Sequence, residues 1–466
     1  MRSSLVPVLA CFVVALGCSS SNDGPNPVGT DTGADDAGGD EVLDSGAPIA
    51  PLPTPPDPAI TCPITLPADP AADKRASCTF GTGAKAAETL GVPAELAGKF
   101  PIRHVIVMMR ENRAFDHLLG KLHDVRPEVE AVPSTFANDD KAGVSVQPFH
   151  ADTTCIHNDP THQWNAMHAA VDGGKMDGFV KSAADTTGTD GHFVMSYYEP
   201  TDLPFDYFLA STWPLNDHHF ASVRSGTTPD RLFMLLATND GVKQTGLDYP
   251  DPQTRTTFDG LNAAGFSWGV FTDGSPLEGA LNWDRSHPGV AKISDFLAAL
   301  DAGTLPNVSY VDAAENTEDD HPTADLQRGE KWVKTIYDHA ITSPEWERLA
   351  IIWTYDEGGA FADHVPPPNV ACVARPDNPK DTPYFELGVR VPFAVISPWA
   401  KPNYVSHVVQ EHTAITRFIE TLFGLPALTA RDANSPALLD LFDFSSCTPP
   451  MLHPKAAPAT GTDGCK

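Results

Sequence analysis

Residues 103–120, RHVIVMMRENRAFDHLLG, decide the fold class. The run at 103–109 is short, apolar and rich in β-branched side chains, which predicts a buried strand. The segment at 114–119 has the pattern of a short helix and ends at Gly120, a common helix stop. Glu111 and Asn112 are therefore expected at the carboxyl end of a strand, directly before a helix.

The same alternation of strand and helix continues along the chain. Apolar runs predict further strands at 266–271, 308–311, 349–354 and 391–396, and Pro392 puts the beginning of the last one near an edge or a strand start. Helical patterns with stop signals lie at 84–90, 294–300, 329–341 and 413–423. This order indicates an α/β domain with a mostly parallel central sheet and helices on both faces.

A second acidic cluster, Asp356-Glu357, follows the predicted strand at 349–354. Ligands of parallel sheets bind at the carboxyl ends of the strands, so this pair and Glu111-Asn112 are expected at the same edge. Three carboxylates in one crevice repel one another unless a cation lies between them, and oxygen ligands suit a divalent metal. The alternative is that these acidic residues are ordinary solvated loop positions.

A third segment, RSGTTPDRLF at 224–233, carries a hydroxyl at a predicted helix start. Thr228 is a good N-cap and Pro229 a good first helical residue, which puts Thr227 just ahead of the helix. A hydroxyl there faces free N–H donors that can hold a phosphate oxygen or an alkoxide, unless both threonines only cap the helix. The spacing resembles the sulfatase signature Cys/Ser-x-Pro-x-Arg, but threonine cannot mature into formylglycine, which favours phosphoryl transfer.

Composition limits the classes of partner. The chain has 466 residues, with 61 Asp and Glu against 31 Lys and Arg, and a formal net charge of -30. A chain of this size can build a large core. So strong an acidic excess repels phosphate backbones, and we therefore expect no nucleic-acid partner.

The first residues have the features of an export signal. The apolar run at 5–16 follows Arg2 and is too short to span a bilayer. Residues 15–18, Ala-Leu-Gly-Cys, resemble a bacterial lipobox, which implies a lipoprotein signal peptide at 1–18 and a lipid on Cys18; an ordinary signal peptide is the alternative. The expected product is a bacterial envelope lipoprotein, on the periplasmic or cell-surface face of its membrane.

The rest of the chain divides into three further parts. Residues 19–60 contain no Lys or Arg and many Asp, Gly, Ser and Pro, which predicts a disordered tether. A folded domain is expected at 61–450 and a tail at 451–466. Six cysteines of this exported part allow up to three disulfides with open pairing, and the alternative zinc cluster lacks any C-x-x-C spacing: Cys62, Cys78, Cys155, Cys372, Cys447 and Cys465.

These motifs together carry a family resemblance. Residues 103–117 resemble the opening motif of the bacterial phosphoesterase family of phospholipases C and an acid phosphatase, which belongs to the alkaline-phosphatase-like superfamily. Further matches follow in the family's order, over about residues 100–445: Asp159–Trp164, 173–179, Leu203–Phe205, His321-Pro322, Asp356-Glu357, 363–367 and 411–413.

The resemblance implies a role for each motif position. Thr227 would be the nucleophile and would form a covalent phosphothreonine intermediate. His162 and His321 would hold phosphate oxygens or protonate the leaving group. Arg231 would anchor the nucleophile turn, and Asp363 and His364 would belong to a supporting shell. Four residues would bind a divalent metal of uncertain identity: Glu111, Asn112, Asp356 and Glu357.

The expected activity is that of a phospholipase C, which releases diacylglycerol and a phosphorylated head group. A broad-specificity acid phosphatase is the enzymatic alternative, and a catalytically silent surface-binding lipoprotein is the alternative from another class.

Asp230 departs from the family, where asparagine is usual, and adds a negative charge one turn from the expected phosphate. The acidic surface favours choline or ethanolamine lipids over anionic ones.

Overall fold

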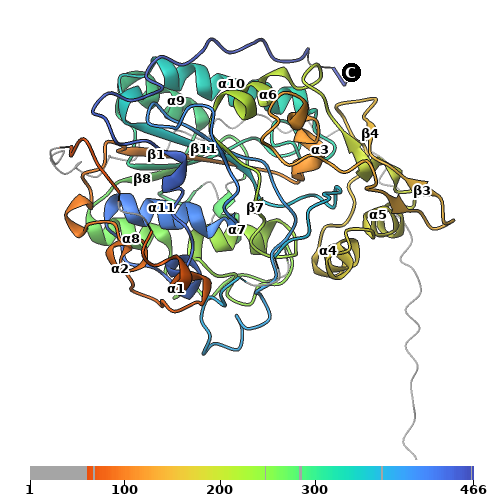
Figure 1. Ribbon diagram of the computed structural model, residues 1–466, viewed down its shortest axis with the longest axis horizontal. Helices are drawn as coiled ribbons and strands as arrows, with labels where there is room; N and C mark the ends of the chain where they lie inside the picture. The colour runs from red at the N-terminus through yellow and green to blue at the C-terminus, as the bar shows by residue number, and fades with distance from the viewer. Residues whose placement is uncertain are drawn as a thin grey trace, which may run out of the picture. The chain divides into compact units, whose positions relative to one another are not determined.

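An eight-stranded sheet forms the centre of the fold (Figure 1), in the order β13-β6-β12-β11-β1-β10-β8-β9. The computed structural model describes residues 60–66, 69–246, 248–275, 277–282, 286–368, 371–462 and 464–465. All strands of this sheet run in one direction except β12, which is antiparallel to both of its neighbours. The strands are β1 (His104–Arg110), β6 (Leu215–Asn216), β8 (Trp268–Thr272), β9 (Val290–Ala291), β10 (Val308–Asp312), β11 (Leu349–Tyr355), β12 (Phe393–Ile396) and β13 (Val405–Ser406).

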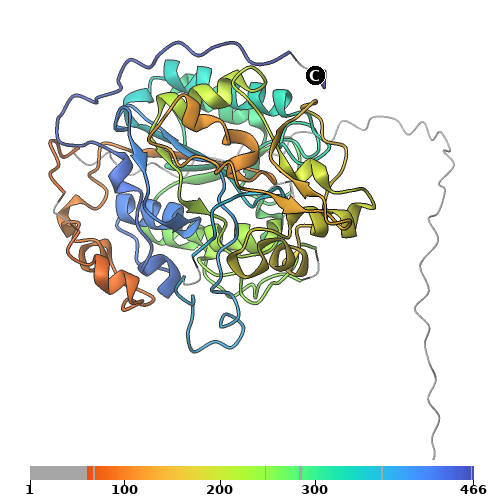
Figure 2. The same ribbon diagram turned by 45° about the vertical axis from the view of Figure 1, so that its right-hand side comes forward.

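Helices cover both faces of the sheet because side chains along a strand alternate between its faces. On β1, Val105 and Val107 pack into one core, together with α7 (Thr227–Leu236), α8 (Thr257–Ala264) and α11 (Thr413–Phe423). Ile106 and Met108 pack into the opposite core, with α3 (Phe115–Leu119), α6 (Pro204–Thr212), α9 (Ile293–Ala302) and α10 (Leu326–Thr342). Figure 2 shows the two helical layers from a second direction.

A smaller unit of helices flanks the sheet. Helices α4 (Trp164–Val171) and α5 (Phe179–Thr187) pack together around their own apolar cluster, which includes Met167, Val180 and Phe361. The remaining elements are short: α1 (Ala72–Ala76), α2 (Ala86–Thr89), α12 (Ala430–Ala433), β2 (Asn138–Asp139), β3 (Ser145–Val146), β4 (Phe149–His150), β5 (Ser196–Tyr197), β7 (His219–Phe220), β14 (Gln410–Glu411) and the 3-10 turns η1 (Ala94–Leu96), η2 (Leu122–Asp124), η3 (Asp172–Gly174), η4 (His192–Met195), η5 (Leu277–Leu281), η6 (Trp346–Arg348) and η7 (Leu439–Leu441).

The predicted fold class is confirmed, and one helix start is corrected. The central strands and the helices at 293–302, 326–342 and 413–423 lie within a few residues of their predicted positions. Helix α7 begins at Thr227 with Gly226 as its N-cap, so Thr228 is not the cap. The extended backbone of Gly226 already starts the helix, and Thr228 N donates to Thr245 Oγ1, 3.1 Å away.

The predicted disulfides form, and they pair distant parts of the chain: Cys62 with Cys447, Cys78 with Cys372, and Cys155 with Cys465. Their sulfur atoms are therefore not free to bind zinc. The signal segment, Cys18 and all of the expected tether except its last residue lie outside the described residues. Within the described part, no helix is long and apolar enough to cross a membrane.

Candidate active site

The register of two central strands brings the acidic clusters together. Strands β1 and β11 are parallel neighbours, and their last residues, Arg110 and Tyr355, are paired. The residues that follow are therefore adjacent at the carboxyl edge: Asp356 N donates to Arg110 O at 2.9 Å, and Asn112 N donates to Asp356 Oδ1 at 3.0 Å. The structure thus brings together the four residues that the resemblance assigned to a metal.

Burial perturbs the carboxylates of this cluster. The side chain of Asp356 is 0% exposed, and burial together with the nearby charge of Glu111 raises its pKa to about 6, although Arg231 opposes the shift. Burial and the charge of Asp356 raise the pKa of Glu357 well above its usual range. Three converging acids with one guanidinium between them form a site that favours a further cation.

Arg231 is the cationic partner within the cluster. Its buried guanidinium donates from Nη2 to Glu111 Oε1 at 2.6 Å and from Nε to Asp356 Oδ2 at 3.3 Å. The residue follows Thr227 by one turn of α7, so it ties the start of this helix to both acidic segments. It therefore does more than anchor a turn, because it also neutralises part of the acidic charge.

Asn112 lies at the centre of the site and is fully buried. With its amide nitrogen facing the carboxylates, it donates to Glu111 Oε2 at 3.0 Å and to Glu357 Oε1 at 2.8 Å, and its oxygen accepts from His321 Nε2 at 3.0 Å. The turn at Gly359 fits closely against it: a Cβ on Gly359 would lie 2.2 Å from Asn112 O, at a φ of +61°. The glycine N–H donates to Glu357 Oε2 at 2.7 Å.

Thr227 presents its hydroxyl to this cluster. It is the first residue of α7, is half-buried, and its Oγ1 donates to Glu111 Oε2 at 3.3 Å. A Cβ on the preceding Gly226 would lie 3.2 Å from His162 Cδ2, so the turn packs directly against the histidine segment. The hydroxyl thus lies at the start of α7, where the positive end of the helix dipole is.

The two predicted histidines approach from separate loops, with ring centres 6.1 Å apart. His162 donates from Nδ1 to Pro160 O at 3.0 Å, its Nε2 lies 3.8 Å from Glu357 Oε1, and burial lowers its pKa. Asp159, which the sequence reasoning did not select, lies 3.8 Å from His162 Nδ1 and 3.9 Å from His321 Nε2. Asp159 is the first residue of the motif Asp-Pro-Thr-His, and this motif could have identified it from the sequence.

A second missed residue supports Asp356 from behind. His412, next to helix α11, donates from Nε2 to the backbone oxygen of Asp356 at 2.7 Å. Its Nδ1 lies 3.3 Å from Nε2 of His219, which is also fully buried. Burial lowers the pKa of both imidazoles, which favours their neutral forms. The sequence motif at 411–413 includes His412 but does not indicate its contact with Asp356.

Asp363 and His364 lie in a neighbouring network. Arg390 donates from Nε to Asp363 Oδ1 at 3.0 Å and from Nη2 to Asp116 Oδ1 at 2.8 Å, and His364 Nδ1 lies 2.6 Å from Asp116 Oδ2. These partners join helix α3, which follows Glu111-Asn112, to the segment that follows Asp356-Glu357. The contacts of Asp363 and His364 thus hold the two acidic segments together and do not reach Thr227 directly.

Asp230 contacts the turn ahead of Thr227. Its Oδ1 accepts from Val223 N at 2.9 Å, and its side chain is fully buried. Burial, reinforced by the charge of Asp356, raises its pKa well above the usual range. The negative charge expected from this departure is therefore suppressed by its surroundings.

The donor set fits a divalent metal. Three carboxylates offer hard oxygen atoms, and a rotation of the Asn112 amide would turn its oxygen, in place of its nitrogen, toward the same carboxylates as a fourth ligand. An open groove of about 740 Å³ lies along α4 and α5. Its lining includes Gln163, the neighbour of His162 in the chain, and three aspartates: Asp172, Asp177 and Asp185.

A family model and several proteins of known activity are similar in sequence to this chain. The model of the Phosphoesterase family matches residues 102–426. The chain is 33% identical over 374 residues to non-specific phospholipase C1 of Arabidopsis thaliana, covering 72% of this chain and 69% of the plant protein. It is 30% identical over 425 residues to phospholipase C A of Mycobacterium tuberculosis, covering 76% of this chain and 80% of that protein. An alkaline phosphatase superfamily protein of solved structure from Vibrio parahaemolyticus aligns with a TM-score of 0.33 and 11% identity, covering 68% of this chain and 77% of that one.

Proposed function

Because this chain belongs to the Phosphoesterase family and is a hydrolase of phosphate esters, we propose that it is a metal-dependent phospholipase C that uses Thr227 as its nucleophile. The observation that carries this proposal is the contact of Thr227 Oγ1 with Glu111 Oε2, 3.3 Å away, at the edge of the buried carboxylate cluster. A hydroxyl at a helix start, beside groups that can hold a cation, suits attack on a phosphate ester.

In the first step, Thr227 Oγ1 attacks phosphorus and the bond from phosphorus to the diacylglycerol oxygen breaks. The hydroxyl proton passes to Glu111 Oε2, its hydrogen-bond acceptor. The phosphorylated head group is then esterified to Thr227. The positive end of the α7 dipole lies at Thr227 and favours the negative charge of the phosphate oxygens.

A metal bound by Glu111, Asn112, Asp356 and Glu357 would neutralise phosphate charge and favour the ionised hydroxyl. The protein's own residues shape this site. Arg231 keeps two of the acids in place, and the N–H groups of Asn112 and Glu357 fix Asp356 Oδ1 at 3.0 and 2.8 Å.

His162 and His321 serve the leaving group and the second step. An imidazolium N–H on the pocket side can protonate the diacylglycerol oxygen as its bond to phosphorus breaks. In the second step a water molecule attacks phosphorus, its proton goes to the same imidazole, and Thr227 leaves with a proton returned to its oxygen. The products are diacylglycerol and the free phosphorylated head group, and one water is consumed.

The groove along α4 and α5 supports a choice of head group. Its lining includes Gln163, next to His162 in the chain, and three aspartates against one lysine: Asp172, Asp177, Asp185 and Lys181. A lining with an excess of acidic groups favours a cationic head group such as choline or ethanolamine.

The proposal is tested with the purified chain after chelation and with added divalent ions. Release of phosphocholine from phosphatidylcholine is measured beside release of phosphate from an aryl phosphate monoester. We expect metal-dependent release of phosphocholine that is lost in Thr227→Ala and kept in Thr228→Ala, a neighbouring hydroxyl. Preference for the monoester would instead assign the chain to the acid phosphatases, and cleavage of neither substrate would contradict the proposal.

We also propose that residues 1–18 direct export and that a lipid on Cys18 anchors the protein in a bacterial envelope. The support is the apolar run at 5–16 and the lipobox-like residues 15–18. Labelling of cells with a radioactive fatty acid should mark the wild-type chain and not Cys18→Ala. Labelling of both chains, or of neither, would contradict the anchor.

A further inference from the structure

The two candidate histidines lie on separate loops that one buried acid joins. His162 belongs to the loop between β4 and α4, and His321 to the loop between β10 and α10. Asp325, the last residue of the second loop, accepts from Thr154 Oγ1 of the first loop at 2.7 Å. Leu326 N donates to the backbone oxygen of the same threonine at 3.2 Å. The two histidine loops are therefore bonded to each other at Asp325.

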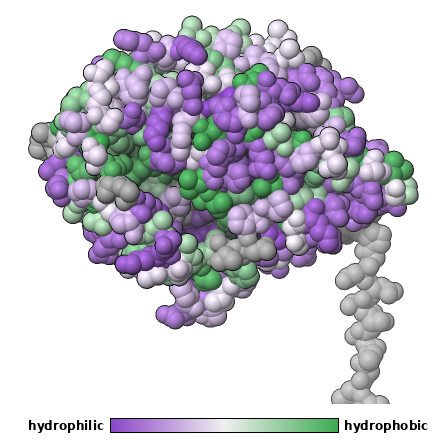
Figure 3. Space-filling model, viewed as in Figure 1, coloured by the Kyte–Doolittle hydropathy of each residue, from purple (hydrophilic) through white to green (hydrophobic). Residues whose placement is uncertain are grey.

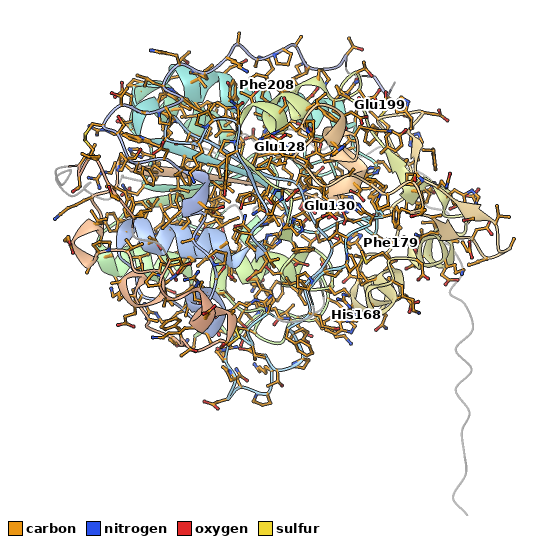
Figure 4. All side chains as sticks on the ribbon, in the orientation of Figure 1. Glu128, Glu130, His168, Phe179, Glu199 and Phe208 are labelled. Atoms are coloured by element: carbon orange, nitrogen blue, oxygen red, sulfur yellow. A yellow bond between two sulfur atoms is a disulfide. The ribbon has the colours of Figure 1, made fainter. Side chains whose placement is uncertain are left out.

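Asp325 is a fixed point because it also begins helix α10. It is the N-cap of this helix, and its Oδ1 accepts from Gln327 N at 3.1 Å. Gln327 Nε2 donates to Asp202 O at 3.1 Å, and Asp202 N donates to the backbone oxygen of Glu199, which is labelled in Figure 4. The start of α10 is thus bonded to a neighbouring turn, which limits its movement.

The carboxyl-terminal tail holds the other oxygen of Asp325. Gly464 N and Cys465 N donate to Asp325 Oδ2 at 3.0 and 3.1 Å. Cys465 forms its disulfide with Cys155, the residue after Thr154 on the first histidine loop. Burial raises the pKa of Asp325, but hydrogen bonds from Gly464 and Thr154 outweigh it and lower the pKa below the ordinary value. The acid is therefore an ionised acceptor shared by both loops and the tail.

The tail reaches this point along helix α10 (Figure 1). Trp346 Nε1 donates to Leu452 O at 2.9 Å beyond the end of the helix, and Gly461 N donates to Glu330 Oε2 at 3.0 Å near its start. A Cβ on Gly461 would lie 2.3 Å from Gln327 Nε2, so the tail contacts the helix closely. It thus returns along α10 to the loop that carries the first histidine.

We propose that Asp325 is a positioning residue for His162 and His321, and that the disulfide of the tail keeps it in place. The inference rests on the proposed function, in which these imidazoles protonate the leaving group and activate water. The two rings have centres 6.1 Å apart, and Ala324 N donates to His321 O at 2.7 Å, which links the acid to this histidine. A shift of about 1 Å in a reacting group can lower a rate about 10²-fold, so small movements of these loops affect the reaction.

Two substrates that differ in their need for a proton donor test the proposal. Diacylglycerol needs a proton to leave, whereas p-nitrophenolate leaves without one. We expect Asp325→Ala to lower kcat/KM about 10–100-fold for dihexanoyl phosphatidylcholine, kept below its micelle concentration, and less than about 3-fold for p-nitrophenyl phosphocholine. Asp325→Asn keeps one oxygen acceptor and should show a smaller loss, again selective for phosphatidylcholine.

Removal of the disulfide is the second test. Cys155→Ser combined with Cys465→Ser should reproduce the selective loss. The matched control is Cys62→Ser combined with Cys447→Ser, which removes another long-range disulfide that joins neither histidine loop and should lower neither kcat/KM.

The outcomes separate this inference from the proposed function. Equal losses on both substrates, or full activity on phosphatidylcholine in the Asp325 and Cys155–Cys465 variants, would overturn the positioning role while the wild-type activity stands. Absence of cleavage by the wild-type chain would contradict the proposed function and this inference with it. Circular dichroism checks folding, and Asp325→Asn gives the answer where Asp325→Ala is unstable.

Discussion

At the scale of single residues, the site has several acidic side chains and few cationic ones to balance their charge. The guanidinium of Arg231 contacts both Glu111 and Asp356. The positions of the acids follow from the sequence, since each directly follows an apolar strand. The contacts that Arg231 and His412 make with these acids did not follow from the sequence, because they join segments far apart in the chain, which local patterns do not encode.

Replacing Arg231 tests its charge. Arg231→Met should lower kcat/KM by about 10²–10³-fold, because two buried carboxylates lose their guanidinium and the nucleophile turn loses its tie. Arg231→Lys keeps a charge with fewer contacts and should retain more activity. Steady-state kinetics on phosphatidylcholine, with circular dichroism for folding, gives the comparison. Equal activity of wild type and Arg231→Met would contradict this role.

At the scale of elements, short turns after the strands position the reactive groups. The long strands and amphipathic helices could be predicted because their patterns span enough residues. The two-residue strands β6, β7, β13 and β14 were missed, since so short a segment has no period to recognise. The start of α7 was placed two residues too late because threonine is a better N-cap by propensity than the extended glycine that takes the role.

The turn at Gly359 should tolerate no side chain. Gly359→Ala places a Cβ against Asn112 O at a positive φ, and we expect a loss of about 2–4 kcal/mol in the free energy of unfolding, together with loss of activity. Gly265 is the control, because it also has a positive φ, of +79°, but a Cβ there meets nothing within 4 Å. Gly265→Ala should cost only about 1–2 kcal/mol in urea unfolding. Equal costs would contradict the contact.

Glu330, a buried acid of helix α10 that accepts from the backbone at the start of helix α6, should make stability depend on pH. Burial raises the pKa of Glu330 to about 7 from an ordinary 4.5, so the folded chain holds a proton that the unfolded chain releases. The free energy of unfolding should therefore fall as pH rises from about 4.5 to about 7, by roughly 2–3 kcal/mol from this group. Glu330→Gln should flatten that part of the curve in urea titrations. An unchanged slope would show that Glu330 is ionised in the folded chain.

At the scale of the whole molecule, charge and disulfides act over long distances. Hydrophilic side chains spread over much of the face in Figure 3, in keeping with a net charge of -30. Three disulfides join residues more than 290 positions apart. The number of disulfides could be predicted from six cysteines, but their pairing depends on the fold and could not.

The net charge predicts a preference among vesicles. Added phosphatidylglycerol should slow the cleavage of phosphatidylcholine, because a negative surface repels the acidic protein, and salt should reduce the effect by screening. Hydrolysis of a soluble phosphate ester, which needs no surface, is the control and should not respond. Faster cleavage on anionic vesicles would contradict the prediction.

In the proposed mechanism Thr227 is the residue that becomes phosphorylated during turnover. The measurement is to quench the enzyme with acid during turnover of phosphatidylcholine and to map the modified peptide by mass spectrometry. We predict a phosphocholine ester on Thr227, absent from Thr227→Ala and present in Thr228→Ala. An adduct on another residue, or full turnover by Thr227→Ala, would contradict the account.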